Sequence, residues 1–268
     1  MNKSIGFIGG GNMAEALIGG LRKTDGEFSF RVNDVVPERL NYLRDKYGVI
    51  PSGLREAAET PAVVVVAVKP KDVRDVLENL RQFEVKGKLI VSIAAGIPLK
   101  LYERYLPDAA VVRVMPNTST AVLHSMTGLA KGQGVTAEQA AAAEKIFAAI
   151  GRVLWIPEEK MNALTALSGS GPAYFYYFTE KLVQAGIQLG LSEKEAELLA
   201  GETLAGAGKM LLESGKSPEK LREEVTSPNG TTFAALTVFR EEGLGDVVMK
   251  AAEACARRAE EMEGEYSA

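Results

Sequence analysis

The sequence predicts an α/β fold: a doubly wound parallel sheet at the N-terminus, followed by an all-helical domain. Apolar runs of strand length alternate with amphipathic segments through the first half, and a glycine-rich turn follows the first of these runs. After about Glu158, no β-branched run recurs. Because strand–helix–strand units cross over with a right hand, their strands form a parallel sheet covered on both faces. We expect domains at residues 1–158 and 159–268.

The first half supplies the elements of this sheet. The segment Ala62–Val68 is apolar throughout, which is typical of a strand buried on both faces. Pro37 at a first turn and Gly48 just past an end delimit a helix. The expected strands are Ser4–Ile8, Phe30–Asn33, Ala62–Val68, Leu89–Gly96, Ala110–Met115 and Val153–Ile156. The expected helices are Asn12–Leu21, Pro37–Tyr47, Asp72–Leu80 and Thr136–Ile150.

The second half reads as helices only. Several of them are apolar on more than one face, as in Ala173–Phe178, and glycines recur inside them. Glycine costs about 1 kcal/mol in a helix interior, so its frequency indicates helices in close backbone contact. Since a single subunit would not bury this much apolar surface, we expect an obligate dimer through the helical domain. The expected helices are Pro172–Gly190, Glu193–Glu213, Pro218–Glu224, Thr231–Glu242 and Asp246–Glu263.

Composition argues against several classes of function. The formal net charge is −4 and there is no basic block, so neither a nucleic acid nor an anionic membrane is an expected partner. No apolar run reaches the roughly 18 residues of a membrane span. A single cysteine, Cys255, forms no internal disulfide, and a reducing cytoplasm is the simplest location. With His124 as the single histidine, a site of several His or Cys ligands is excluded, whereas a site of carboxylates alone is not; we predict no metal.

The stretch KSIGFIGGGNMAEALIGGLRK, residues 3–23, places three consecutive glycines between a strand and a helix. In the pattern Gly9-x-Gly11-x-x-Ala14, the first glycine allows a tight turn and the second lets a pyrophosphate approach the backbone. Ala14 lets the helix pack closely on the sheet, and the pyrophosphate lies at the helix N-terminus. A plain strand–helix turn gives no reason for a tripled glycine. The pattern therefore predicts a Rossmann-type dinucleotide-binding domain.

Asp34 follows the second expected strand and bears on the choice of cofactor. A carboxylate there accepts hydrogen bonds from both ribose hydroxyls of NADH and repels the 2′-phosphate of NADPH. The alternative is that Asp34 caps the next helix, although Pro37 at the first helical position makes Val36 the N-cap. Arg31 and Arg39 are close in sequence and could still receive a phosphate. We expect NADPH or NADH as cofactor, with Asp34 favouring NADH.

Three further segments carry a resemblance to a known family: VVAVKP at 65–70, LSGSGPAY at 167–174 and VTSPNGTT at 225–232. Together with the glycine loop that precedes them in the sequence, these segments resemble pyrroline-5-carboxylate reductase, the last enzyme of proline synthesis. The resemblance implies a Rossmann domain followed by an all-helical dimerisation domain. It also implies reduction of the ring imine of 1-pyrroline-5-carboxylate to L-proline with NADPH or NADH. Members form dimers, often assembled into decamers, so we expect a homodimer and leave a pentamer of dimers open.

The resemblance also implies which residues form the site. The substrate would bind at Gly230, Thr231 and Thr232, contributed by the partner subunit. Asn117 in the segment MPNTS would lie near the nicotinamide or the substrate. The cofactor would contact the glycine loop and the ends of two further strands, through Ile8, Gly9, Gly10, Gly11, Asn12, Met13, Ala67, Val68, Lys69, Pro70, Ile93, Ala94 and Ala95.

Four residues at three places depart from the family pattern. Asp34-Val35 stands where members often carry Asn-Arg or similar polar residues suited to a 2′-phosphate, which puts a preference for NADPH in doubt. Asn229 replaces a usual glycine, and asparagine tolerates a left-handed backbone better than most residues do. Ser119 replaces a proline.

The implied chemistry needs few reactive side chains. A protonated imine already accepts a hydride, so the protein has to orient the reactants and exclude water. Backbone N–H groups and the helix dipole at the start of Thr231–Glu242 form an anion site suited to the substrate carboxylate. We expect Thr232 to contact the ring nitrogen or the carboxylate and to help deliver the proton. The alternative is that Thr231 and Thr232 only cap the helix.

Two other functions stay open. A small hydroxy-acid dehydrogenase would share both domains, but it needs a lysine or histidine beside the substrate carbonyl, and neither Lys181 nor Lys209 has an obvious polar partner in the sequence. A non-catalytic NADH-binding sensor subunit would lack the threonine-bearing loop, which this chain keeps. The segment Ser168–Gly171 does not match a nucleophile elbow, which needs glycine two residues before and after the serine. We interpret it as a tight entry to the following helix, near the cofactor.

Overall fold

The computed structural model of the chain describes residues 3–24 and 27–267. The chain divides into two compact units. The first runs up to Ser170 and also takes in the residues from Ala254 onward, and the second is Gly171–Glu253. This division differs from the expected domain bounds, 1–158 and 159–268, because residues 159–170 and the end of the last helix pack with the first unit.

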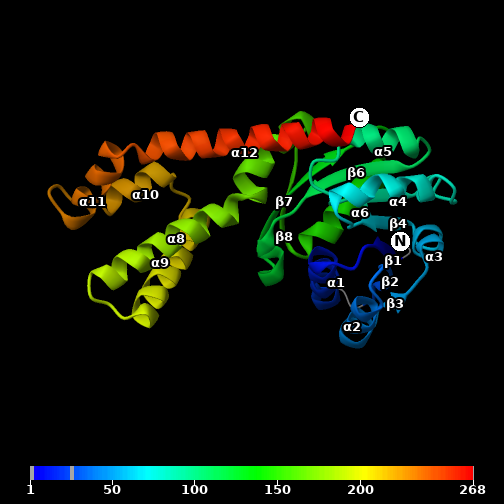
Figure 1. Cartoon of the computed structure of the whole chain (residues 1–268), viewed down its shortest axis with the longest axis horizontal. Helices are drawn as coiled ribbons and strands as arrows, with labels where there is room; N and C mark the ends of the chain where they lie inside the picture. Colours follow the sequence, from blue (N-terminus) through cyan, green and yellow to red (C-terminus); the bar gives the residue numbers. More distant parts are fainter. Residues whose placement is uncertain (1–2, 25–26, 268) are drawn as a thin grey trace. The chain divides into compact units, whose positions relative to one another are not determined.

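The first unit is built around an eight-stranded sheet of described residues (Figure 1). The strand order is β3-β2-β1-β4-β5-β6-β7-β8, so the chain starts inside the sheet and winds outward in both directions. In such sheets, ligands bind at the carboxyl ends of the strands next to the point of reversal, here between β1 and β4. The strands are β1 (Ser4–Ile8), β2 (Ser29–Asn33), β3 (Ile50–Pro51), β4 (Val63–Val66), β5 (Leu89–Ser92), β6 (Ala110–Met115), β7 (Ser125–Lys131) and β8 (Gly151–Trp155).

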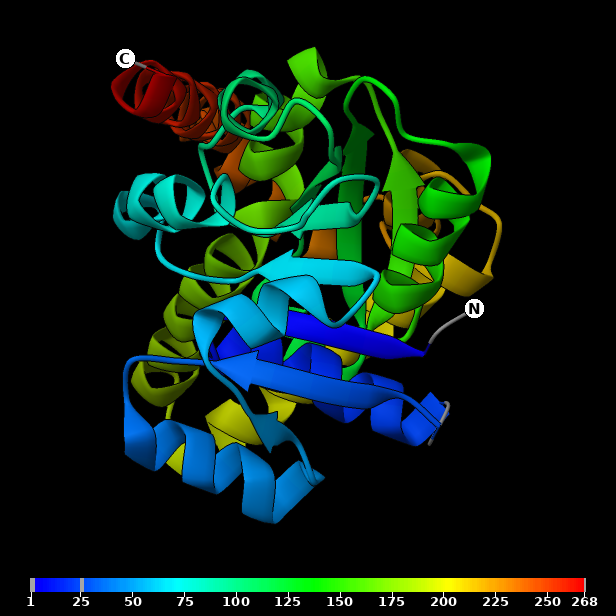
Figure 2. The same ribbon diagram turned by 90° about the vertical axis from the view of Figure 1, so that its right-hand side faces the viewer.

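Helices cover both faces of the sheet (Figure 2). In β4, Val65 packs with one helix layer, while Val64 and Val66 pack with the other, which explains why this strand is apolar throughout. The first layer comprises α1 (Asn12–Thr24), α2 (Pro37–Tyr47) and α6 (Ala137–Ala148). The second layer comprises α3 (Leu54–Glu59), α4 (Val73–Leu80), α5 (Leu99–Tyr105) and α7 (Met161–Leu164).

One pair of strands departs from the parallel pattern. β6 and β7 run antiparallel, whereas the flanking pairs β5–β6 and β7–β8 are parallel. Residues 116–124, which include the 3₁₀ helix η2 (Thr118–Val122), make the whole connection between β6 and β7. Because a parallel crossover needs about a dozen residues or more, this short link forces the reversal. The sequence pattern did not indicate β7.

The other unassigned elements are also short. They are β3, α3, α5, α7, a π-helical turn η4 (Thr165–Gly169), and the 3₁₀ helices η1 (Pro70–Asp72) and η3 (Glu158–Lys160). The longer expected elements agree with the observed ones to within a few residues. Pro37–Tyr47, Ala110–Met115 and Glu193–Glu213 agree at both ends.

The second unit is helical throughout its ordered elements. They are α8 (Gly171–Gln188), α9 (Glu193–Glu213), α10 (Pro218–Glu224), α11 (Thr231–Glu241) and the first part of α12 (Leu244–Ser267). α8 leaves large apolar side chains exposed in the single chain, among them Phe175 (58%), Tyr176 (61%) and Tyr177 (63%). These are the faces for which the sequence predicted a partner subunit. None of the described helices is long and apolar enough to cross a membrane.

Candidate active site

The loop after β1 passes from strand to helix through three glycines with different roles. Gly9 has φ +98°, and a Cβ on it would lie 2.7 Å from the carbonyl oxygen of Ala67, so no larger residue fits without strain. At Gly11, a Cβ would meet no atom of the chain within 4 Å. The lack of a side chain at Gly11 therefore serves no packing need. It leaves the backbone open to a ligand.

α1 begins directly behind this open backbone. Ala14 is fully buried and holds the helix against the sheet. The first N–H groups of a helix, here those of Asn12 and Met13, have no carbonyl within the helix to bind. These donors and the helix dipole favour an anion. A dinucleotide phosphate fits this cradle, because Gly11 leaves room for it and the start of α1 supplies donors.

Gly10, the middle residue of the loop, is held from both sides of its backbone. Its N–H donates to Oδ2 of Asp34 at 2.6 Å, and its carbonyl accepts a hydrogen bond from Nε of Arg39 at 2.5 Å. The other oxygen of Asp34 accepts the N–H of Val36 at 2.9 Å. Val36 is the N-cap of α2 and has no side-chain cap bond. Asp34 thus fixes the entry to α2 from outside the helix and orients the glycine loop as well.

The two arginines considered as phosphate ligands are both engaged within the first unit. Arg31 forms an ion pair with Glu56 of α3. Arg39 binds Glu15 of α1 at 2.6 Å, in addition to the carbonyl of Gly10. Sequence reasoning missed Glu15, whose only visible signal was an acidic residue in the first turn of α1.

The strand ends expected to flank the nicotinamide lie at the same edge of the sheet as the glycine loop. The N–H of Ala67 donates to the carbonyl of Ile8 at 2.8 Å, which aligns the end of β4 with that of β1. The N–H of Ile93 donates to Val66 at 3.1 Å and aligns β5 in the same way. Lys69 is exposed and precedes η1. The structure therefore brings together the residues that follow β1, β4 and β5, including Val68, Pro70, Ala94 and Ala95.

Asn117 is buried, and both ends of its side-chain amide are hydrogen-bonded. Its Nδ2 donates to the carbonyl of Ser168 at 3.1 Å, and its Oδ1 accepts the N–H of Ser119 at 3.1 Å. Ser168 lies in the π-helical turn η4, and its hydroxyl donates to the carbonyl of Met126 at 3.0 Å. Asn117 therefore anchors the segment after β6 to the turn that precedes α8. The sequence predicted a tight entry to the following helix at Ser168–Gly171 but did not show that Asn117 is its partner.

The threonine-bearing loop belongs to the second unit. The N–H of Gly230 donates to the carbonyl of Ser227 at 3.0 Å, and Asn229 has φ +58°. Proline at the second position and a positive φ at the third are the pattern of a type II turn, and asparagine tolerates that conformation. Gly230 is the N-cap of α11 and no side chain caps the helix. Thr231 and Thr232 follow in its first turn.

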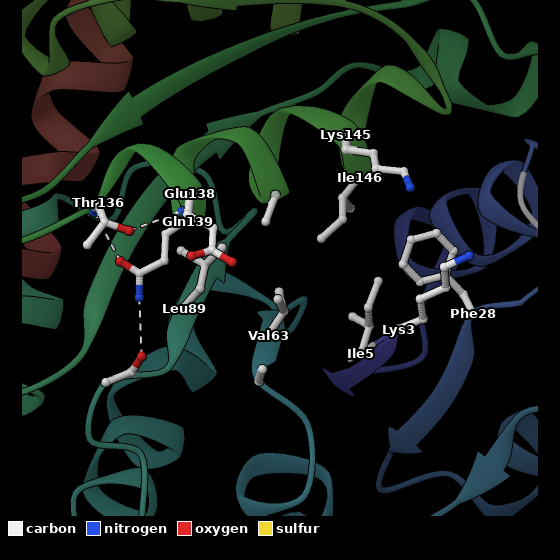
Figure 3. Close-up of a pocket in the computed structure, with 13 residues that line it drawn as sticks. Lys3, Ile5, Phe28, Val63, Leu89, Thr136, Glu138, Gln139, Lys145 and Ile146 are labelled. Atoms are coloured by element: carbon white, nitrogen blue, oxygen red, sulfur yellow. Dashed lines mark hydrogen bonds between the residues drawn. The ribbon is translucent and has the colours of Figure 1, made fainter. Parts of the chain in front are cut away.

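A cavity of about 370 Å³ lies at the opposite edge of the sheet from the glycine loop. Ile5, Val63 and Leu89, at the amino ends of β1, β4 and β5, form its apolar floor, and α6 lines one side (Figure 3). Parallel α/β sheets bind nucleotides at the carboxyl ends of their strands, so this cavity is not the dinucleotide site. Among the described residues, no three His, Cys, Asp or Glu side chains are grouped to hold a metal ion.

Comparison with known proteins identifies relatives along nearly the whole chain. Residues 158–262 match the family model for pyrroline-5-carboxylate reductase dimerisation, and residues 4–96 match the model described as NADP oxidoreductase, coenzyme F420-dependent. Pyrroline-5-carboxylate reductase 2 of Bacillus subtilis is 36% identical over 270 residues, which cover 99% of this chain and 97% of that protein. The chain belongs to the pyrroline-5-carboxylate reductase family.

Solved structures of the family share the fold of this chain. The pyrroline-5-carboxylate reductase of Coxiella burnetii is 37% identical, with a TM-score of 0.91 over 97% of this chain and 98% of that one. The Plasmodium falciparum pyrroline carboxylate reductase, solved with NADP bound, is 28% identical, with a TM-score of 0.87 over 97% and 98% of the two chains. The fold class and the family predicted from the sequence are confirmed.

Membership in the pyrroline-5-carboxylate reductase family makes the chain an NAD(P)-binding oxidoreductase. Its second unit lies within the dimerisation region of that family. The exposed apolar side chains of α8 lie in this dimerisation region, and apolar surface of this extent is typical of subunit interfaces.

Proposed function

We propose that this chain reduces the ring imine of 1-pyrroline-5-carboxylate to L-proline with NADH, the last step of proline biosynthesis. The observation that carries the proposal is the start of α11. There the turn at Asn229 presents Thr231 and Thr232 in an uncapped first turn. Such a helix start offers backbone N–H groups and hydroxyls to a small anion. The substrate carries a carboxylate and an imine nitrogen, which need such donors.

The cofactor is proposed to bind along the carboxyl edge of the sheet. Its phosphates meet the backbone of Ile8, Gly9, Gly10 and Gly11 and the first turn of α1 at Asn12 and Met13. Its nicotinamide half lies beside Ala67, Val68, Lys69, Pro70, Ile93, Ala94 and Ala95. Asn117 is assigned an indirect role beside the nicotinamide or the substrate, because its side chain is hydrogen-bonded to Ser119 and Ser168 within the chain.

The bound reduced nicotinamide supplies the hydride. The protein's own residues have to hold the substrate, orient it and control one proton. Gly230, Thr231 and Thr232, contributed by the partner subunit, bind the carboxylate through backbone N–H groups. The hydroxyl of Thr232 contacts the ring nitrogen or the carboxylate and helps deliver the proton, directly or through water.

Preference for NADH is proposed from the surroundings of Asp34. A 2′-phosphate at the end of β2 would face the carboxylate of Asp34. Arg31 and Arg39, which could neutralise it, are paired with Glu56 and Glu15. The exposed Val35 offers no positive charge.

The surroundings of Lys181 argue against the alternative of a hydroxy-acid dehydrogenase. Nζ of Lys181 binds Glu180 at 2.9 Å and Gln184 at 3.1 Å on the exposed surface of α8. The hydrogen bond from Lys181 to Glu180 raises the pKa of the lysine, so the amine stays protonated and is not available as a general base. A non-catalytic sensor subunit would not need the threonine-bearing loop, so the presence of this loop argues against that alternative.

A homodimer, with a pentamer of dimers as the larger assembly, is proposed from the family and from the exposed apolar faces of α8. Sedimentation velocity on the full chain distinguishes the two sizes. We propose a cytoplasmic location, in keeping with the single free Cys255.

The function is tested by following NADH and NADPH absorbance with 1-pyrroline-5-carboxylate, and then NAD⁺ and NADP⁺ with a panel of small hydroxy acids. We expect turnover with the imine and a higher kcat/KM with NADH. Turnover only with hydroxy acids would identify a dehydrogenase, and cofactor binding without turnover would identify a sensor.

A further inference from the structure

Glu15 lies in the first turn of α1 and gathers the polar side chains of α2 around it. Its carboxylate accepts hydrogen bonds from Arg39 (2.6 Å), Tyr42 (2.9 Å), Lys46 (3.0 Å) and Tyr47 (3.1 Å). Two of these donors are cations and two are phenols. The side chain of Glu15 is 18% exposed. The cluster therefore joins α1 to α2 immediately beside the glycine loop.

The carboxylate of Glu15 keeps its charge throughout the physiological pH range. Burial alone would raise its pKa, but the hydrogen bonds from Arg39, Lys46, Tyr42 and Tyr47 together outweigh burial and lower the pKa from 4.5 to about 2. Glu15 is thus a permanent counter-ion for Arg39.

Arg39 is the member of the cluster that reaches the cofactor site. Its Nε donates to the carbonyl of Gly10, whose N–H is held by Asp34. A guanidinium near the ribose end of a dinucleotide is suited to a 2′-phosphate, because it can donate two parallel hydrogen bonds to it. In this chain, Nε of Arg39 is used by Gly10 and Nη2 by Glu15.

We propose that Glu15 determines cofactor specificity by holding Arg39 on the glycine loop and neutralising its charge, so that the chain selects NADH over NADPH. The inference rests on the proposed function in two respects: a nicotinamide dinucleotide binds at the glycine loop, and that dinucleotide is NADH in preference to NADPH. Asp34 and Glu15 then act on the same choice by different routes. Asp34 acts by direct contact with the ribose, and Glu15 as a positioning residue that acts through Arg39.

The test compares the full-length chain with Glu15→Gln. Dissociation constants for NADH and NADPH are measured by nicotinamide fluorescence without substrate. We expect the variant to shift the ratio of the two constants toward NADPH by at least about tenfold, the effect of releasing one charge-assisted hydrogen bond to a phosphate. Asp45→Asn removes the same charge from α2 outside the cluster, where Asp45 contacts Arg44, and should leave the ratio unchanged.

Two further variants separate the proposed route from a general loosening of the loop. Glu15→Gln combined with Arg39→Gln should lose the gain for NADPH. Arg39→Gln alone should leave the ratio within about twofold of wild type, because the guanidinium is already withheld from the phosphate. This single variant keeps the test valid if Glu15→Gln does not fold.

The outcomes that overturn the proposal are distinct. They are an unchanged ratio in folded Glu15→Gln, a gain that survives in the double variant, and a strong loss of NADPH binding in Arg39→Gln alone. If the wild type binds both dinucleotides but does not reduce 1-pyrroline-5-carboxylate, the proposed function fails while the binding ratio still decides the role of Glu15.

Discussion

The carboxylate of Asp34 accepts the backbone N–H of Gly10 at 2.6 Å and so joins the end of β2 to the middle of the glycine loop. The other carboxylate oxygen of Asp34 accepts the backbone N–H of Val36 at 2.9 Å and so fixes the start of α2. Val35, which lies between Asp34 and Val36 in the sequence, is 94% exposed. The hydrogen bonds of the Asp34 carboxylate, rather than packing of Val35, therefore hold this segment in place. The residue expected to choose the cofactor also shapes the loop proposed to bind it.

Replacing Asp34 by Asn should lower kcat/KM with NADH by about tenfold, since an amide has one acceptor oxygen for two backbone donors and for the ribose. NADPH should be affected less, because the repulsion of its 2′-phosphate is removed. Steady-state kinetics with both cofactors checks this, with the exposed Asp75→Asn as control. An equal fall with both cofactors would contradict the assignment.

Substitution by alanine should lower stability at Gly9 and lower the affinity for NADH at Gly11. Gly9→Ala places a Cβ 2.7 Å from the carbonyl oxygen of Ala67 at a positive φ, and should cost roughly 1–3 kcal/mol of stability. Gly11→Ala has free space and should keep the melting temperature while raising the dissociation constant for NADH at least about tenfold. Thermal melts and fluorescence titrations separate the two effects. A stable Gly11→Ala variant with unchanged NADH affinity would place the phosphates elsewhere.

Thr232→Ala should lower kcat by about tenfold or more if its hydroxyl helps deliver the proton, without changing the melting temperature. Thr237→Ala, on the same helix, is the control, because the Thr237 hydroxyl donates to the carbonyl of Phe233 at 2.9 Å and not outward. Equal kinetics for Thr232→Ala and wild type would remove Thr232 from the site. Thr232→Ser should recover most of the activity.

The contribution of Glu15 to stability should depend on pH with a definite sign. Its pKa is lowered from 4.5 to about 2 in the folded chain. The stabilisation is therefore complete above pH 4.5 and is lost as the pH falls from there toward 2. Glu15→Gln should melt below wild type at pH 7, and the difference should narrow at pH 3. A difference that stays constant across this range would show that Glu15 stabilises the fold by packing alone.

Arg113 on β6 pairs with Glu158 at 3.0 Å and with Glu263 near the end of α12, and its side chain is only 5% exposed. Arg113→Met leaves two carboxylates without this cation and should lower the free energy of unfolding of the first unit by roughly 3–5 kcal/mol. Urea titration followed by Trp155 fluorescence measures it, since Trp155 lies on β8 of the same unit. The exposed Arg152→Met should change stability by less than about 0.5 kcal/mol, and a similar loss in both variants would argue against the buried pair.

The long elements of the fold were predictable because their signals are local. The apolar run at β4, proline and glycine at the two ends of α2, and the serine start of α9 each specify an element within one stretch of sequence. β7 was missed because its sequence, SMTGLAK, mixes small and polar residues with a glycine and lacks a β-branched run. Its position in the sheet is set by the short link from β6, which is a tertiary constraint.

The site was predictable only where it is built from consecutive residues. The glycine loop and the turn at Asn229 follow from backbone requirements that single residues reveal. The bonds from Asp34 and Arg39 to Gly10, and the pairing of Asn117 with Ser168, join residues far apart in the sequence. No periodicity encodes such pairs, so the roles of Glu15 and Ser168 became visible only with the fold.

The helix α12 contributes residues to both compact units, and its last part, from Ala254 on, belongs with the sheet. A fragment that ends at Ser170 would therefore lack Glu263, one of the two ion-pair partners of Arg113. It would also lack Tyr266, which packs against the second helix layer. An independently folding nucleotide-binding fragment needs residues 254–267 rejoined after Ser170 through a short linker. In the sequence, the helical unit is flanked on both sides by residues of the sheet-containing unit, as an inserted domain would be. Exchange of this unit between proteins in evolution would therefore require two chain junctions, whereas exchange of a terminal domain requires one.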